Sequence, residues 1–149
     1  MIQTNYLVLI LFFFSLVCCK IKETTNKNDS TSSCKKVELL DDYVFPKNDA
    51  SYSISKAYLK GDLLSIIVEY SGGCKVHHWA LKGSKGFMKS FPPKKGLFLE
   101  HDSQSDICRK LITDTLRFDT SPTKYPNKEK NYNVIIILNG YKENIVYSY

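Results

Sequence analysis

Short runs of alternating apolar and polar residues, separated by turn-forming residues, constrain the fold of this chain more than any other feature. The clearest example is the run 63–70, in which Leu64, Ile66 and Val68 fall on one face of an extended strand. The expected strands are 37–45, 51–59, 63–70, 76–81, 97–101, 113–118, 134–138 and 145–149. Only the segment 107–112 favours a short helical turn.

The composition agrees with a sheet protein. The chain contains 10 Tyr and 8 Phe among 149 residues, and aromatic residues are enriched in strands. Several short strands at close spacing are typical of a sandwich or a barrel. We therefore expect an all-β fold, an antiparallel two-sheet sandwich of immunoglobulin-like type, with a small β-barrel as the alternative.

The N-terminus predicts export and lipid attachment. Residues 6–17 are an uncharged apolar run of the length found in secretory signal peptides, and Cys18 and Cys19 follow it. With Leu16 three positions before Cys19, this segment resembles a bacterial lipobox, which implies cleavage after residue 18 and a lipid on Cys19. Cleavage before Cys18 is the fallback, and an uncleaved anchor helix is the other alternative.

Three parts of the chain follow from this prediction. Residues 1–18 are the lipoprotein signal peptide, residues 19–35 a flexible tether, and residues 36–149 the sandwich domain. The tether is expected because residues 20–33 are polar and offer too little apolar surface to order themselves. The expected location is the bacterial cell envelope, lipid-anchored at the outer membrane.

The charge of the chain does not identify a partner. The formal net charge is +6 and the pI is about 9.0, but the lysines are scattered and not clustered. No nucleic-acid-binding signature is present, and export removes the chain from nucleic acid. The expected contacts are the membrane, through the N-terminal lipid, and an unknown protein, peptide or glycan.

Two stretches, 70–81 and 101–108, contain most of the chemically reactive side chains. Cys74 and Cys108 lie one in each stretch, and in an exported domain such a pair is expected to form a disulfide. His77, His101 and Asp106 lie close to these cysteines in the sequence and are the candidate ligand or loop site. Cys34 is then either free or the partner of a second chain.

Two chemical alternatives use the same residues. Cys74 and His77, with His101 and Cys108, supply four ligands that a zinc ion accepts, although export favours oxidation of the thiols. A cysteine beside a histidine can also act as a nucleophile. We expect no cofactor and no catalytic residue, and the alternative is a metal- or thiol-dependent enzyme that uses Cys74, His77, His101, Asp106 and Cys108.

The spacing of these residues also carries a resemblance. The pattern GGCxxH at 72–77 followed by HDxxxDxC at 101–108 resembles a layout in small uncharacterised lipoproteins of Bacteroidetes-type bacteria. More distantly, residues 50–149 are similar to the C-terminal sandwich of NigD-like lipoproteins. The resemblance implies a sandwich fold and no assigned reaction. Our main hypothesis is therefore a non-enzymatic envelope lipoprotein that binds or supports a partner.

Overall fold

The computed structural model describes residues 34–41, 43–46, 51–126 and 132–149. The expected signal peptide, the lipidated Cys19, its fallback Cys18 and almost all of the tether lie outside these residues. The described residues contain no helix that is long and apolar enough to cross a membrane.

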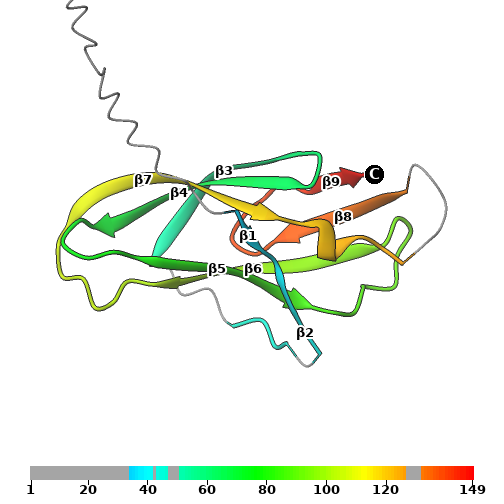
Figure 1. The fold of residues 1–149 in the computed structure, drawn as a ribbon, viewed down its shortest axis with the longest axis horizontal. Helices are drawn as coiled ribbons and strands as arrows, with labels where there is room; N and C mark the ends of the chain where they lie inside the picture. The colour runs from blue at the N-terminus through cyan, green and yellow to red at the C-terminus, as the bar shows by residue number, and fades with distance from the viewer. Residues whose placement is uncertain (1–33, 42, 47–50, 127–131) are drawn as a thin grey trace, which may run out of the picture. The chain divides into compact units, whose positions relative to one another are not determined.

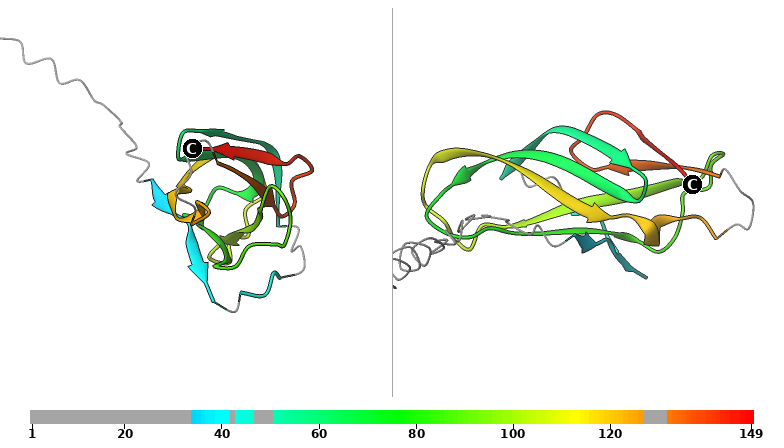
Figure 2. Two further views of the ribbon diagram at one scale, coloured as in Figure 1. Left: turned by 90° about the vertical axis from the view of Figure 1, so that its right-hand side faces the viewer. Right: turned by 45° about the horizontal axis from the view of Figure 1, so that its top comes forward.

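The described strands form two sheets that pack face to face (Figures 1 and 2). The four-stranded sheet has, in spatial order, β1 (Lys35–Lys36), β7 (Lys110–Asp119), β4 (Leu63–Gly72) and β3 (Tyr52–Lys60). The five-stranded sheet has β2 (Glu38–Leu40), β5 (His78–Ser84), β6 (Lys94–Asp102), β8 (Asn133–Leu138) and β9 (Ile145–Ser148). One 3₁₀ turn, η1 (Ser121–Thr123), follows β7.

The expected two-sheet sandwich is confirmed, and the sheets do not close into a barrel. Both sheets are mixed instead of purely antiparallel, because β1 pairs with β7, β2 with β5, and β6 with β8 in parallel. Strands joined by short turns pair antiparallel, as β3 does with β4. The parallel pairs join strands that lie far apart in the sequence. The alternation of apolar and polar residues within a strand does not predict which strand it pairs with.

The core lies between the two sheets and is built from the inward faces that the alternation predicts. Leu64, Ile66 and Val68 of β4 and Leu97 and Leu99 of β6 have no exposed surface. The remaining core residues share this apolar, buried character: Val37, Ala57, Tyr70, Trp79, Leu81, Phe118, Val134, Ile136, Leu138, Ile145 and Tyr147. Burial of these side chains supplies the main drive for folding.

Two strands differ from their predicted course: of the expected strand 37–45 only β2, Glu38–Leu40, is present among the described residues, and β7 begins earlier than expected. The segment 107–112 favoured a short helical turn, but β7 already begins at Lys110. It pairs with the central strand β4 without interruption, from Gly72 opposite Lys110 to Leu63 opposite Asp119. Pairing along a long central strand outweighs the weak local preference of a few residues. This pairing brings the start of β7 beside the end of β4.

Candidate functional site

Two connections lie side by side at one end of the sandwich, the left-hand end in Figure 1. One leads from β4 to β5 and the other from β6 to β7. We call residues 72–77 and 103–109 together the tip. The expected disulfide cysteines and the candidate ligand residues lie in the tip, except His101, which lies near the end of β6.

A disulfide joins the two connections of the tip. Cys74 and Cys108 are bonded, and their Cα atoms lie 5.9 Å apart. The expected pairing is therefore present. Cys34 is the free and exposed cysteine of the described residues.

The carboxylate of Asp106 forms the polar centre of the tip. Its Oδ2 accepts hydrogen bonds from the backbone N–H groups of Gly73, Cys74 and Lys75, at 2.9, 3.0 and 3.0 Å. Its Oδ1 accepts a further bond from the N–H of Cys108, at 2.9 Å. The side chain has 0% exposure. The backbone bonds from Cys108, Cys74 and Lys75, that of Cys108 first, hold the pKa of Asp106 well below its ordinary range.

A chain of side-chain hydrogen bonds continues from Asp106 across the site. Its Oδ2 lies 3.2 Å from Nε2 of His77, and Nδ1 of His77 lies 2.8 Å from Nε2 of His101. Nδ1 of His101 lies 2.9 Å from Oγ of Ser51, just before β3. We call these four side chains the histidine chain. The histidine chain therefore runs from the two connections of the tip to Ser51, at the edge strand β3 of the four-stranded sheet.

Aromatic rings enclose the histidine chain. The ring of His101 stacks on Trp79, with centroids 4.0 Å apart and 11° between the planes. Tyr70 lies beside His77, at a centroid distance of 4.7 Å. Burial, and secondarily the neighbouring His77, lowers the pKa of His101, while Asp102 acts in the opposite direction. Burial among these rings therefore favours the neutral form of His101.

This arrangement does not provide the free thiolates that the zinc site and the thiol nucleophile both need. The closest group of ligand atoms belongs to Cys74, Asp106 and Cys108, within 4.8 Å of one another. The expected zinc site and the expected cysteine nucleophile both use Cys74 or Cys108 as a thiolate, and a sulfur in a disulfide is not a thiolate. His77 is also closed off, with 2% side-chain exposure, and its two ring nitrogens face Asp106 and His101.

Sequence reasoning placed His77, His101 and Asp106 beside the bridge, but it missed Ser51 and did not predict that Gly72 packs against His77. Ser51 precedes an edge strand fifty residues away from His101, and no local pattern links the two. Gly72 is needed because a Cβ at this position would lie 2.5 Å from Nε2 of His77. The two adjacent glycines at 72 and 73 were the available signal.

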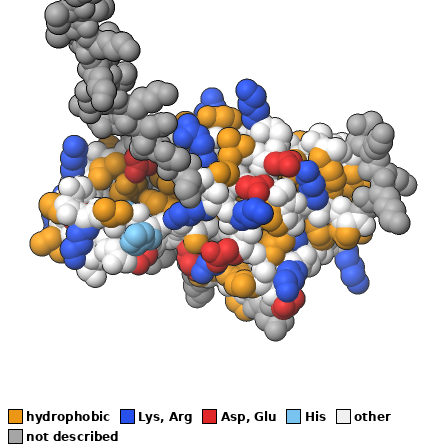
Figure 3. All heavy atoms as spheres, viewed as in Figure 1, with side chains coloured by type: hydrophobic (Ala, Val, Ile, Leu, Met, Phe, Trp, Pro, Cys, Tyr) orange, Lys and Arg blue, Asp and Glu red, His pale blue; other side chains and the backbone are white. Residues whose placement is uncertain are grey.

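The outer surface of the tip is apolar and basic. The side chains of Val76 and Ile107 are 75% and 91% exposed. Lys75, Arg109 and Lys110 are exposed beside them in the sequence. In the space-filling view, hydrophobic side chains lie among lysine and arginine side chains at this end of the sandwich (Figure 3). The amine of Lys75 also donates to the carbonyl of Gln104, at 2.7 Å, which ties the two connections together again.

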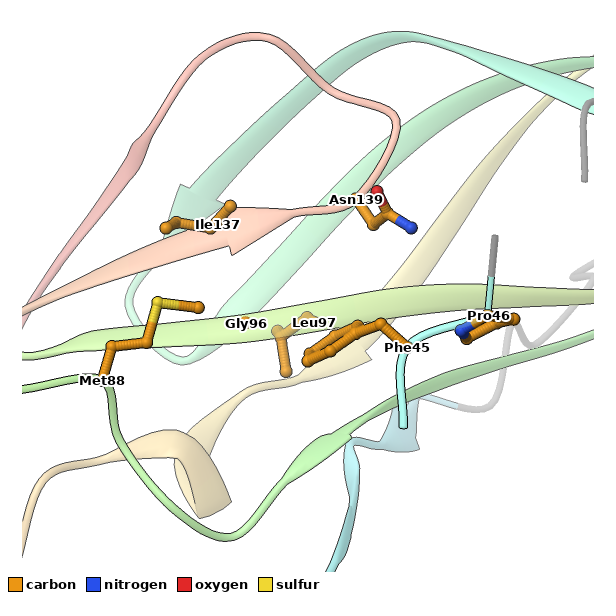
Figure 4. Close-up of a pocket in the computed structure, with 7 residues that line it drawn as sticks. All are labelled: Phe45, Pro46, Met88, Gly96, Leu97, Ile137 and Asn139. Carbon is orange, nitrogen blue, oxygen red and sulfur yellow. The ribbon is translucent and has the colours of Figure 1, made fainter. Parts of the chain in front are cut away.

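A shallow apolar pocket of about 440 Å³ lies away from the tip, over the first half of β6. The ring of Phe45 lies along β6 at Gly96, with Met88 on the other side of the pocket (Figure 4). A Cβ at position 96 would lie 2.7 Å from Cζ of Phe45, so glycine allows this close packing. The other lining residues are Pro46, Leu97, Ile137 and Asn139.

No protein-family model matches the chain, and no curated protein matches its sequence. Among solved structures, a NigD-like immunity protein from Bacteroides caccae is similar, with 13% identity and a TM-score of 0.51. The match covers 70% of this chain and 51% of that protein, so the chain spans about half of its length. A toxin-related protein from Parabacteroides distasonis matches at 16% identity over 78% of this chain and 61% of its own, with a TM-score of 0.44.

The first of these similarities concerns the fold. It agrees with the distant resemblance to NigD-like proteins that the sequence indicates. The chain therefore has a sandwich fold related in architecture to that of a NigD-like immunity protein.

Proposed function

We propose that this protein is a non-enzymatic binding module of the bacterial cell envelope, anchored by a lipid on Cys19, and that the tip contacts a protein partner. The observation that carries this proposal is the exposure of Val76 and Ile107 on a rigidly held tip. Each residue lies next to a residue of the histidine chain, since Val76 precedes His77 and Ile107 follows Asp106.

A rigid presentation favours binding. Ordering a flexible loop on association costs free energy, and a surface that is already ordered avoids that cost. The disulfide and the Asp106 hydrogen bonds order the tip before any partner arrives. Burying an aliphatic side chain contributes roughly 1.5–3 kcal/mol. The basic side chains at the tip suit a partner with an acidic rim.

The direction of the chain supports an outward-facing tip. Lys35 and Lys36 pair with Phe118 and Asp119, at the end of β7 that is opposite to Lys110. Phe118 lies eight residue steps along the strand from Lys110, which corresponds to roughly 27 Å. The chain therefore enters the domain at the end far from the tip, so a lipid-anchored tether leaves the tip free to meet a partner.

A metal- or thiol-dependent enzyme remains the second hypothesis, but no feature of the described tip favours it. It requires Cys74 and Cys108 as thiolates, and both sulfurs are in the disulfide. Metal analysis and thiol counting on the oxidised protein separate the hypotheses. Stoichiometric metal with two additional free thiols supports the enzyme, while the absence of both supports the binding module.

Site-specific photo-crosslinking in the producing bacterium tests the proposed contact. A photoreactive residue is placed at position 107 and, in a matched control, at position 146, because Val146 is a 58% exposed residue on β9. We expect one discrete crosslinked protein from position 107 and none from position 146. Equal crosslinking at both positions, or none at position 107, contradicts the proposed contact.

Metabolic labelling tests the proposed anchor. Cells are grown with labelled palmitate, and the wild-type chain is compared with Cys19→Ala and Cys18→Ala. We expect Cys19→Ala to abolish incorporation and Cys18→Ala to keep it. Incorporation that depends on Cys18 alone assigns the lipid to the fallback site, and a wild-type chain without label refutes the anchor.

A further inference from the structure

We propose that Phe91, in the connection between β5 and β6, inserts into the headgroup region of an anionic lipid bilayer and so sets the orientation of the domain on the membrane. We call residues 85–93 the β5–β6 loop. This inference rests on the proposed function, since it deepens the proposed lipid anchor. It follows from the exposure of Phe91, the charges beside it and the place of the loop in the fold.

The β5–β6 loop presents apolar side chains to the solvent. Phe91 is 93% exposed, the highest value among the large hydrophobic residues that the structure describes. Met88 is 46% exposed and lies at the edge of the apolar pocket, across from Phe45 (Figure 4). A ring as exposed as that of Phe91 contributes almost nothing to the core, whereas an exposed aromatic residue with an aliphatic neighbour suits a membrane interface.

The base of the β5–β6 loop is held firmly to the sandwich. The side chain of Lys95 on β6 is buried, and its Nζ donates to the carbonyl oxygens of Ser84, Lys85 and Gly86, at 3.0, 2.8 and 3.0 Å. The same Nζ lies 3.7 Å from the ring centroid of Phe87. Three backbone acceptors and an aromatic face therefore bind one ammonium group. The exposed part of the loop is thus presented on a fixed base.

Basic residues flank Phe91, and the β5–β6 loop contains no acidic residue. Lys89 precedes Phe91 by two residues and is exposed, and Lys94 follows it by three. Lys85 is exposed at the start of the loop, where its amine also pairs with Asp41 at 2.7 Å. Lysine side chains at a membrane interface rest their aliphatic stems on apolar surface while their amines reach lipid phosphates. The surroundings of Phe91 therefore suit an anionic bilayer.

The β5–β6 loop lies at the end of β5 that is opposite to the tip. Strand β5 begins beside the tip at His78 and ends at Ser84, and the loop that follows lies at the right-hand side of Figure 1. The described chain enters through β1, which pairs with the end of β7 that is also away from the tip. The expected tether, residues 20–33, spans roughly 20 Å as a random coil. A lipid on Cys19 would therefore keep the loop within reach of the bilayer.

Attachment to the membrane makes a modest contact sufficient. A group that a linker holds near its site has a high local concentration, so a contact that is weak for the free domain is still formed. Insertion of Phe91 then turns the opposite end of the sandwich away from the membrane. The lipid anchor and the β5–β6 loop together direct Val76 and Ile107 of the tip toward a protein partner.

Fluorescence quenching by lipids with brominated acyl chains tests this inference on the chain purified from its own membranes. The variant Phe91→Trp is reconstituted into vesicles of phosphatidylcholine and phosphatidylglycerol, and the matched control is Val76→Trp at the tip. The wild-type chain supplies the background emission of Trp79, which is buried. We expect bromination to lower the added emission of Phe91→Trp about twofold or more and to leave that of Val76→Trp unchanged. Emission at position 91 that bromination does not lower, or equal quenching at both positions, overturns the inference.

The composition of the vesicles tests the role of the lysines. In vesicles of phosphatidylcholine alone, the quenching at position 91 should weaken about twofold or more, because the basic side chains lose their anionic partners. Equal quenching in both kinds of vesicle overturns the assignment to an anionic bilayer. A photoreactive residue at position 91 that crosslinks one discrete protein in the producing bacterium, and no lipid, also overturns it.

Flotation of the same vesicles in a density gradient reports the anchor separately. A chain that floats without quenching at position 91 overturns this inference and leaves the anchor intact. A chain that does not float refutes the anchor and this inference with it. Phe91→Trp should melt at the wild-type temperature, because the replaced side chain is exposed. The tip contact is read independently, by crosslinking from position 107.

Discussion

The two ends of the sandwich are each organised around an aspartate, but they are held in different ways. At the tip, Asp106 binds four backbone N–H groups and a histidine, and a disulfide joins the same loops. At the other end, Asp62 in the β3–β4 turn accepts from the hydroxyl of Tyr147 at 2.6 Å and from the amine of Lys124 at 3.0 Å.

This difference reflects what lies beneath each aspartate. Tyr147 has no exposed surface and belongs to the core, so Asp62 is attached to an element that apolar packing already fixes. The tip extends beyond the last core residues of β4 and β6, and there a covalent bond and polar contacts replace packing. The contacts at Asp62 contain no imidazole and lower its pKa, so acid disturbs them only below about pH 4.

Removing the disulfide is expected to have the largest effect on stability. The double variant Cys74→Ser/Cys108→Ser frees a loop that spans 34 positions. The chain-entropy model predicts a loss of about 3–4 kcal/mol in the free energy of unfolding. Urea denaturation measures it, and the control is Cys34→Ser, which removes an exposed free thiol and keeps the disulfide, with an expected change within about 0.5 kcal/mol. An unchanged midpoint in the double variant would show that the polar contacts alone hold the tip.

Adding a side-chain carbon at Gly72, next to His77, is expected to have the next largest effect on stability. In Gly72→Ala the new Cβ lies 2.5 Å from Nε2 of His77, which must move away from Asp106. Overpacking of this kind costs about 1–3 kcal/mol. Gly86→Ala is the matched control, because its Cβ meets only Oγ of Ser84 at 3.5 Å. Equal melting temperatures for the two variants would contradict the close packing at His77.

Removing the Tyr147 hydroxyl, which binds Asp62 at the end of the sandwich away from the tip, is expected to destabilise the fold less. Tyr147→Phe retains the buried ring and removes the hydrogen bond to Asp62, at an expected cost of about 1–2 kcal/mol. Because this bond is remote from the tip, amide protection in residues 72–77 should be that of the wild-type chain at matched pH. A loss of protection at the tip in this variant would show that the two ends are coupled.

Changing the exposed surface of the tip is expected to have the smallest effect on stability. In Val76→Ser/Ile107→Ser the two side chains leave no cavity, because they are 75% and 91% exposed. The free energy of unfolding should change by no more than about 0.5 kcal/mol. Crosslinking from a photoreactive group at the neighbouring position 75 should be lost. A large loss of stability would mean that these residues support the fold instead of serving as a contact surface.

The sequence predicted the elements of this molecule better than their pairing. Alternation identified the buried faces of β4 and β6, and the predicted export of the chain led to the expected pair Cys74 and Cys108. The sequence did not predict the hydrogen bond between Ser51 and His101, nor that β7 begins as early as Lys110. Both features depend on strands that pair across a long sequence separation. The geometry of a site assembled from remote strands is set by sheet register, which short patterns do not encode.

Backbone ¹⁵N relaxation on the oxidised chain at neutral pH tests the central claim, that the tip is a rigidly held surface, most directly. The account predicts order parameters near 0.85 for residues 73–77 and 103–107, equal to those of β4 and β6. Order parameters below about 0.6 in these residues would contradict it, since they describe a flexible loop and not a pre-organised contact surface.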